Sequence, residues 1–349
     1  MPLPRTGTDR SRRNGHRPVP GAAFLARRTF SSAPGRDHPP VAAPLIGPAA
    51  SVVYSRVDLD WWGRDTGGTD HVSAISIGQA VVLGVVEGVT EFLPVSSTGH
   101  LKIAEGLMDI PVDDRSVVAF TAVIQVGAIA AVLLYFSRDI VRYLTAWGRG
   151  LADREQRYHH DYRFTWWVIC ATIPVVLVGL AAKPLIEGPL ASLWVVAASL
   201  IVGSGLMWAA DRAGRHKRGE DDTGFRDAML VGCAQILALL FPGFSRSGAT
   251  ISTGLLLDLD RLAATRLSFF LGIPSLTGAG LYELKDATGG GVGAVPLAVG
   301  TVVSFAVAYA SIAWLLKFVA GHSFNAFVIY RIAIGAALFG LLGAGVLNS

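Results

Sequence analysis

The stretch GVVEGVTEFLPVSSTGH, residues 84–100, decides the fold because it places two carboxylates, a proline and a histidine inside an apolar run. Glu87 and Glu91 are four residues apart, so on a helix they share one face. Pro94 interrupts that helix, since proline has no backbone N–H to donate. At membrane depth, a broken helix is tolerated only where protein or a wet cavity satisfies its backbone. The stretch therefore predicts an interrupted membrane helix that carries polar chemistry.

The composition of the whole chain also favours a membrane protein. Its 349 residues are 52% hydrophobic and only 16% charged, with 40 glycines. Soluble domains carry about 25% charged residues, and small residues let membrane helices pack closely. The net charge of +4 does not indicate nucleic acid, because the basic residues lie in tails and loops between apolar spans, as topology signals do. We therefore expect no nucleic-acid partner.

The chain divides into two parts. Residues 1–72 hold nine of the 17 prolines, ten arginines and no lysine, which predicts a disordered N-terminal extension; a misplaced start codon is the alternative. Residues 73–349 are the predicted membrane domain. Apolar stretches of about 20 residues are long enough to cross a bilayer. We expect six such spans, at 116–136, 164–182, 191–210, 264–282, 294–316 and 326–347.

Two further apolar regions are interrupted midway, and we interpret both as re-entrant helix hairpins. Residues 75–108 break at Pro94 and residues 228–257 break at Pro242-Gly243, and each then enters a turn rich in serine and glycine. The two regions also resemble each other, although chance similarity between apolar helices is the alternative. An offset of 148 residues gives the identities Gly84/Gly232, Pro94/Pro242, Ser97/Ser245, Ile103/Ile251, Gly106/Gly254 and Leu107/Leu255. A shift by one aligns SSTG at 96–99 with SRSG at 245–248.

Three full spans separate the two regions, and an odd number places them on opposite sides of the membrane. The predicted fold is therefore an all-α polytopic membrane protein, with about six transmembrane helices plus two re-entrant hairpins arranged as an inverted repeat. The loops 137–163 and 211–227 carry six and five lysines and arginines, whereas the other loops carry one each. Because basic loops are cytoplasmic, we expect the first hairpin to enter from the outer face and the second from the cytoplasmic face.

The first hairpin carries candidate catalytic residues. Glu87 and Glu91 either hold a divalent cation through oxygen ligands, or one of them acts as a general base; a pair in an aqueous vestibule is the non-functional alternative. The hydroxyls of Ser96, Ser97 and Thr98, with Gly99, form a turn at a helix N-terminus, which favours an anion such as phosphate. An ordinary helix cap needs only one hydroxyl.

The histidine at the end of this turn and the arginine of the second hairpin complete the predicted site. His100 is a candidate nucleophile, acid or base, or else a structural histidine. Arg246 lies between Ser245 and Ser247, with Gly248 next, and its guanidinium suits bidentate phosphate contacts. A structural salt bridge to an acid of the first hairpin is the alternative, and both roles can coexist. If the hairpins meet, these groups converge on one site.

Other polar residues receive weaker predictions. Gln125 and the stretch 268–275 are candidates for lining a cavity. Lys317, His322 and Arg331 lie near span ends and are interpreted as interfacial anchors. No Walker A loop or GxGxxG is present, so we expect no nucleotide cofactor.

The segments EGVTEFLPVSSTGH at 87–100 and PGFSRSGAT at 242–250 closely resemble the two signature motifs of the undecaprenyl-diphosphate phosphatase, or bacitracin-resistance, family. The resemblance covers about residues 75–349 and shows no departure in either motif. It implies hydrolysis of undecaprenyl diphosphate to the monophosphate and inorganic phosphate, which recycles the lipid carrier for peptidoglycan synthesis. It also implies resistance to bacitracin, which competes by sequestering this substrate.

The resemblance further implies a site that faces the outer side of the bacterial cell membrane and uses a divalent cation. We expect Glu87 and Glu91 to hold this ion (Mg²⁺ or Ca²⁺), and we expect the protein to form a homodimer. Carried over by motif position, the catalytic residues are Glu87, Glu91, Ser97, His100 and Arg246. The nucleophile stays open between Ser97, His100 and water. A transporter or lipid flippase is the competing class, since inverted repeats with broken helices are a transporter design. The acid pair with His100 favours the enzyme, because transport of an anion needs neither.

Overall fold

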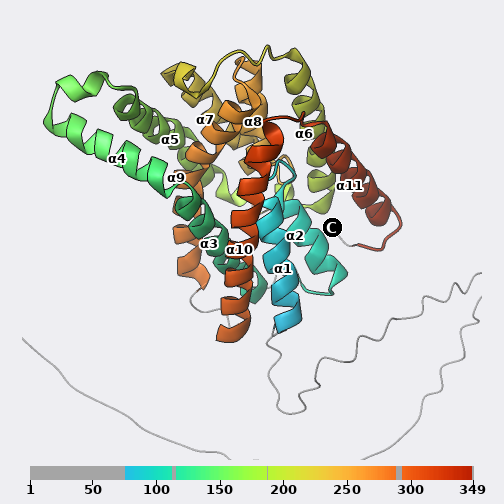
Figure 1. Ribbon diagram of the computed structural model, residues 1–349. Coiled ribbons are helices and arrows are strands. Elements are labelled where there is room, and N and C mark those ends of the chain that lie inside the picture. Colours follow the sequence, from blue (N-terminus) through green and yellow to red (C-terminus); the bar gives the residue numbers. More distant parts are fainter. Residues whose placement is uncertain (1–74, 112–114, 187, 288–292, 348–349) are drawn as a thin grey trace, which may run out of the picture. The chain divides into compact units, whose positions relative to one another are not determined.

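A computed structural model describes residues 75–111, 115–186, 188–287 and 293–347 (Figure 1). The predicted disordered extension at 1–72 lies outside these residues. The described chain is helical, with one isolated bridge between Arg218 and Leu259. Its helices are α1 (Ile77–Thr90), α2 (Ser97–Leu107), α3 (Arg115–Tyr135), α4 (Ser137–Ala152), α5 (His160–Ile186), α6 (Leu193–Ala213), α7 (Phe225–Leu240), α8 (Arg246–Leu256), α9 (Arg261–Ala287), α10 (Ala294–Val319) and α11 (Asn325–Gly343). Three short 3-10 helices lie at Glu155–Tyr158, Pro189–Ala191 and Glu220–Asp222.

Within the described ranges, five helices are long and apolar enough to cross a membrane, and they confirm five of the six predicted spans. These helices are α3 from Ser116 onward, α5, α6, α10 and α11. The sixth predicted span, 264–282, lies within α9, which has the length but not the composition of a span. Arg266, Ser268 and Ser275 make α9 too polar, because this helix serves the interior of the bundle and not only lipid.

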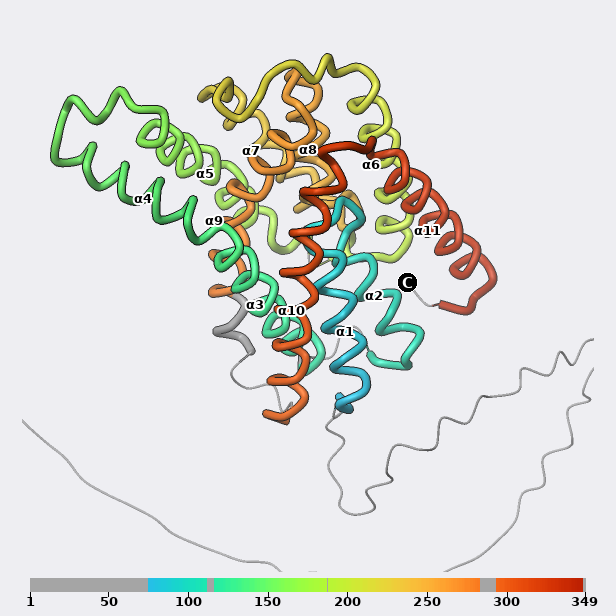
Figure 2. Tube along the Cα trace, viewed as in Figure 1, coloured from blue at the N-terminus to red at the C-terminus, as the bar shows by residue number. Residues whose placement is uncertain are grey.

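The two interrupted regions each form a pair of packed helices, α1 with α2 and α7 with α8. Each first helix lies along a long helix, α1 along α10 and α7 along α5 (Figure 2). Glycines permit these close approaches. A Cβ at Gly84 would lie 2.6 Å from the carbonyl oxygen of Gly300, and a Cβ at Gly232 would collide with the carbonyl oxygen of Ala171. The glycines that the sequence comparison aligned thus perform the same packing task.

The turns between the paired helices end in the same backbone conformation. Ser96 and Ser245 precede α2 and α8 with φ of 78° and 72°, and the hydroxyl of each accepts from the amide of the third residue of its helix. The second helices end alike, because Asp109 and Asp258 both have positive φ. These matches all follow an offset of 149 residues, whereas the prolines and the packing glycines follow 148. One residue more stands between the proline and the capping serine in the second pair.

Arg331 corrects one expectation from the sequence. It was predicted to be an interfacial anchor, but its side chain in α11 is fully buried. The guanidinium donates to the carbonyl of Pro94 at 2.9 Å and to those of Gly243 and Phe244 at 3.2 and 2.9 Å. It also donates to the hydroxyl of Ser204 at 3.1 Å. Arg331 therefore satisfies the backbone of both breaks at once, as a broken helix in an apolar setting requires.

Candidate active site

A cavity of about 1080 Å³ lies where the two turns meet. The charged pair and the serines of the turns supply one polar side of it. Helices α3, α5, α7 and α9 supply the other residues, which are mostly apolar with single polar side chains among them. Predicted residues that line it are Glu91, Ser96, Ser97, Thr98, Gln125, Ser245, Arg246 and Ser275. The sequence prediction that residues of both interrupted regions converge is therefore met for most of the named side chains.

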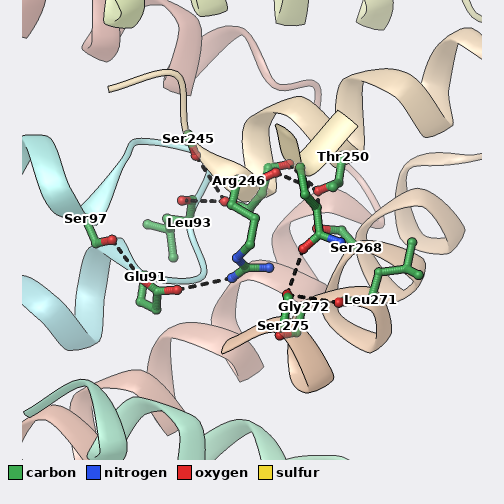
Figure 3. Close-up of polar contacts among 12 residues, drawn as sticks. Glu91, Leu93, Ser97, Ser245, Arg246, Thr250, Ser268, Leu271, Gly272 and Ser275 are labelled. Atoms are coloured by element: carbon green, nitrogen blue, oxygen red, sulfur yellow. Dashed lines mark hydrogen bonds and ion pairs between the residues drawn. The ribbon is translucent and has the colours of Figure 1, made fainter. Parts of the chain in front are cut away.

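Glu91 connects the two turns (Figure 3). One carboxylate oxygen, Oε2, accepts from the Ser97 hydroxyl at 2.6 Å, and the other, Oε1, accepts from Arg246 Nη2 at 3.2 Å. The carboxylate and the guanidinium are both largely buried, with side-chain exposures of 6% and 15%. A buried charge pair needs such extra hydrogen bonds to offset desolvation. The predicted salt bridge between the hairpins thus forms, and it also brings a serine hydroxyl next to a base.

Arg246 lines the cavity, and its guanidinium lies between the Glu91 carboxylate and α9. Its Nη1 is buried, and no protein atom in the described part of the chain accepts from it. The guanidinium lies against Gly272 of α9, where a Cβ would collide with Nη1. A buried donor without an acceptor is costly unless a ligand supplies one. The geometry is suited to an anion that bridges Arg246 and the turn.

The serines around Arg246 hold the two turns together. Ser247 donates to the carbonyl of Leu93 at 2.9 Å, and its Oγ lies 3.2 Å from that of Ser245. Ser245 in turn accepts from the amide of Gly248 at 3.1 Å. Ser247, Gly248 and their counterpart Gly99 do not line the cavity. These predicted substrate-binding residues lie behind the cavity wall, where they shape the turns.

Glu87 is also absent from the cavity wall. It lies in α1 one helical turn before Glu91 and is 2% exposed. The described residues contain no group of three or more His, Cys, Asp and Glu side chains that could hold a metal ion. Magnesium is commonly held by one or two carboxylates together with substrate phosphates. Of the two predicted ligands, Glu91 lines the cavity and Glu87 does not, and the assignment of both residues to a metal ion stays a prediction.

His100 is not among the residues that line the cavity. Its Nδ1 lies 2.7 Å from the carbonyl of Ser96, and its Nε2 lies 2.8 Å from the hydroxyl of Tyr330 in α11. The two rings stack with centroids 5.5 Å apart. The structure therefore brings Glu91, Ser97 and Arg246 together, but it does not place His100 among the cavity residues.

Three further polar side chains line the cavity without having been predicted. Lys183 of α5 donates to the hydroxyl of Tyr282 of α9 at 3.2 Å. Gln235 of α7 contacts Ser275 of α9. Nothing in the sequence around Lys183 or Tyr282 marked them. Gln235 had a signal, because the 148-residue offset aligns it with Glu87.

Comparison with known proteins adds to this geometry. The model of the family described as Bacitracin resistance protein BacA matches residues 80–337. Undecaprenyl-diphosphatase 1 of Streptomyces coelicolor is 82% identical over 278 residues, which cover 80% of this chain and 100% of the relative. Its namesake from Frankia alni is 78% identical with the same coverage. The undecaprenyl-diphosphatase of Cutibacterium acnes is 52% identical over 279 residues, covering 77% of this chain and 98% of the relative.

The matched residues include both interrupted helix pairs, the cavity between them and most of α11. The family model covers well over half of the chain, and the relatives align over nearly their whole length. This chain belongs to the bacitracin resistance protein family.

Proposed function

We propose that this protein hydrolyses undecaprenyl diphosphate to undecaprenyl phosphate and inorganic phosphate. One observation carries the proposal: a buried acid, a serine hydroxyl and an arginine with a free donor meet in one cavity. A phosphatase needs these groups to activate a nucleophile and to neutralise phosphoryl oxygens. The relatives named undecaprenyl-diphosphatase supply the identity of the lipid.

Ser97 is the nucleophile in this proposal. Its hydroxyl gives its proton to Glu91 Oε2 while Oγ forms a bond to the terminal phosphorus. The bond between that phosphorus and the bridging oxygen breaks, and undecaprenyl phosphate leaves. Glu91 passes its proton to the bridging oxygen of the departing undecaprenyl phosphate, so the carboxylate can act as a base again. The oxygen of a water molecule then bonds to the phosphorus while Glu91 takes a proton from it. The bond from phosphorus to Ser97 Oγ breaks, and Oγ recovers that proton from Glu91 as inorganic phosphate is released. The 2.6 Å hydrogen bond supports this choice over His100, whose Nε2 lies beside Tyr330.

Arg246 neutralises charge on the transferred phosphoryl group, as guanidinium groups do in phosphoryl transfer. The donors of the first turn assist it. Glu91 is the carboxylate best placed to share a divalent cation with the substrate phosphates, and such an ion would add positive charge to the same oxygens. The apolar wall from α5 and α9 suits the start of the prenyl chain.

The membrane arrangement is part of the same proposal. The two interrupted pairs act as re-entrant hairpins of an inverted repeat, supported by their shared turn geometry and helix partners. The protein lies in the bacterial cell membrane, and the cavity opens toward its outer side. The basic residues between α3 and α5 and between α6 and α7 support this orientation. Sequestration of the substrate by bacitracin and a homodimer remain predictions.

Purified protein in detergent micelles, given undecaprenyl diphosphate and Mg²⁺, tests the activity through release of inorganic phosphate. We expect release by the wild type and loss of release in Arg246→Ala and Ser97→Ala. A wild type that binds the lipid without releasing phosphate would support the transporter class. Mass spectrometry after rapid quenching identifies the nucleophile. Phosphate on His100, or no phosphoprotein while turnover continues, would refute the role given to Ser97.

A further inference from the structure

Gln235 has an unusual environment for an uncharged side chain. It lies in α7, 2% exposed, and lines the active-site cavity. Its Oε1 accepts from the Ser275 hydroxyl at 2.8 Å, and Ser275 also contacts the carbonyls of Leu271 and Gly272. The amide is therefore fixed from one side by α9.

The other end of the amide is unsatisfied. Nε2 is buried, and no protein atom in the described ranges accepts its hydrogens. The same is true of Nη1 of Arg246 in the same cavity. A buried donor left without an acceptor costs more than a typical hydrogen bond contributes. Two such donors from separate helices, α7 and α8, indicate a ligand with several acceptor oxygens.

We propose that Gln235 is a substrate-binding residue whose Nε2 donates to a phosphate oxygen of the prenyl diphosphate. The proposal rests on the proposed function and adds a contact outside the two signature motifs. Ser275 is a positioning residue, because its hydroxyl holds Oε1 and so leaves Nε2 as the end of the amide that a ligand can satisfy. An amide can donate a hydrogen bond to a phosphate oxygen. A carboxylate at this position would be a second acid beside Glu91 and would repel the diphosphate.

Purified wild type is compared with Gln235→Leu, which keeps the bulk and removes the donor, and with Gln235→Glu, which adds charge. The measurements are kcat and KM for undecaprenyl diphosphate and equilibrium binding of inorganic pyrophosphate. For Gln235→Leu we expect KM and the pyrophosphate Kd to rise by roughly 10-fold to 100-fold. Both values should rise further in Gln235→Glu. The matched control is Gln125→Leu in α3, a half-buried cavity glutamine whose shifts should be smaller.

Unchanged KM and pyrophosphate affinity in Gln235→Leu would overturn the proposal, as would a fall in kcat alone with normal binding. Improved binding in Gln235→Glu together with a lower Mg²⁺ requirement would also overturn it, because the side chain would then face a cation. Should Gln235→Leu fail to fold, Ser275→Ala decides by the same two measurements. If the wild type releases no phosphate, the proposed function is refuted. The role of Gln235 is then tested by pyrophosphate binding alone.

Discussion

The two interrupted helix pairs have the same backbone but opposite chemistry. Both place a serine with positive φ at the turn, cap the second helix with its hydroxyl and pack the first helix through a glycine. The first pair contributes Glu91, whereas the equivalent position in the second is Leu239. The second contributes Arg246, whereas the equivalent position in the first is Ser97. A site that needs an acid, a hydroxyl and a cation is thus divided between two similar scaffolds.

This division means that neither pair forms the site alone. Glu91 and Arg246 are 155 residues apart in sequence, and their contact depends on the two turns meeting. Arg331 fixes that meeting from a third element, because it binds the carbonyls of both turns. The two similar backbones position the site, and the different side chains that they carry perform the reaction.

Removing the positive charge of Arg246 from the second helix pair should have the largest effect. Arg246→Ala is expected to lower kcat/KM for undecaprenyl diphosphate by about 10³-fold, since the lost contacts stabilise charge in the transition state. Arg246→Lys should recover part of the activity, because the charge returns without the bidentate geometry. Phosphate release by purified protein measures both. This assignment would be contradicted if kcat/KM of Arg246→Ala stayed within about tenfold of the wild-type value, which corresponds to about 1.4 kcal/mol.

The second-largest effect is expected from removing Arg331, the residue that joins the two helix pairs. Arg331→Met leaves the carbonyls of Pro94, Gly243 and Phe244 without their donor. The expected loss of unfolding free energy is about 3–5 kcal/mol, because several buried acceptors become unsatisfied. Equilibrium unfolding by SDS in mixed micelles measures it. Arg149→Met on exposed α4 is the matched control and should change stability by less than about 0.5 kcal/mol. Equal losses in the two variants would refute a joining role for Arg331.

The sequence was sufficient for the local features of this comparison. Apolar length predicted six spans, of which five are confirmed, and the prolines marked both breaks. The polar residues of the two turns predicted which side chains meet, because buried charges need partners and few other polar side chains were available. The one-residue change of offset across the turns also has a visible cause, since an extra residue follows Pro242.

Features set by distant packing were not predictable. Arg331 lies 237 residues from Pro94, and no local pattern separates a buried arginine near a span end from one at the lipid surface. His100 and Tyr330 are 230 residues apart, so the sequence did not reveal that the ring does not line the cavity. Glu87 shares a helix face with Glu91, yet only Glu91 lines the cavity, because α1 ends there and the chain turns.

The packing glycines offer a test of equivalence between the pairs. Gly84→Ala and Gly232→Ala should each cost about 1–3 kcal/mol of unfolding free energy, since a Cβ would meet the backbone of α10 or α5. Gly205→Ala in α6 is the control, because nothing lies within 4 Å of its Cβ position. SDS unfolding compares the three. A loss at only one of the first two positions would show that the pairs are supported differently.

The capping serines should give the smallest effects and the finest comparison. Ser96→Ala and Ser245→Ala each remove a helix cap, which costs about 1 kcal/mol. The loss should be larger for Ser245, because its bond to the Gly248 amide is 3.1 Å and the Ser96 bond to Gly99 is 3.5 Å. Glycine at either position should cost only a few tenths of a kcal/mol, about 0.3, since it also adopts positive φ without strain. SDS unfolding of the four variants measures the order. Alanine and glycine of equal cost would mean that φ is not strained, and a larger loss at Ser96 would mean that the first turn depends more on its cap.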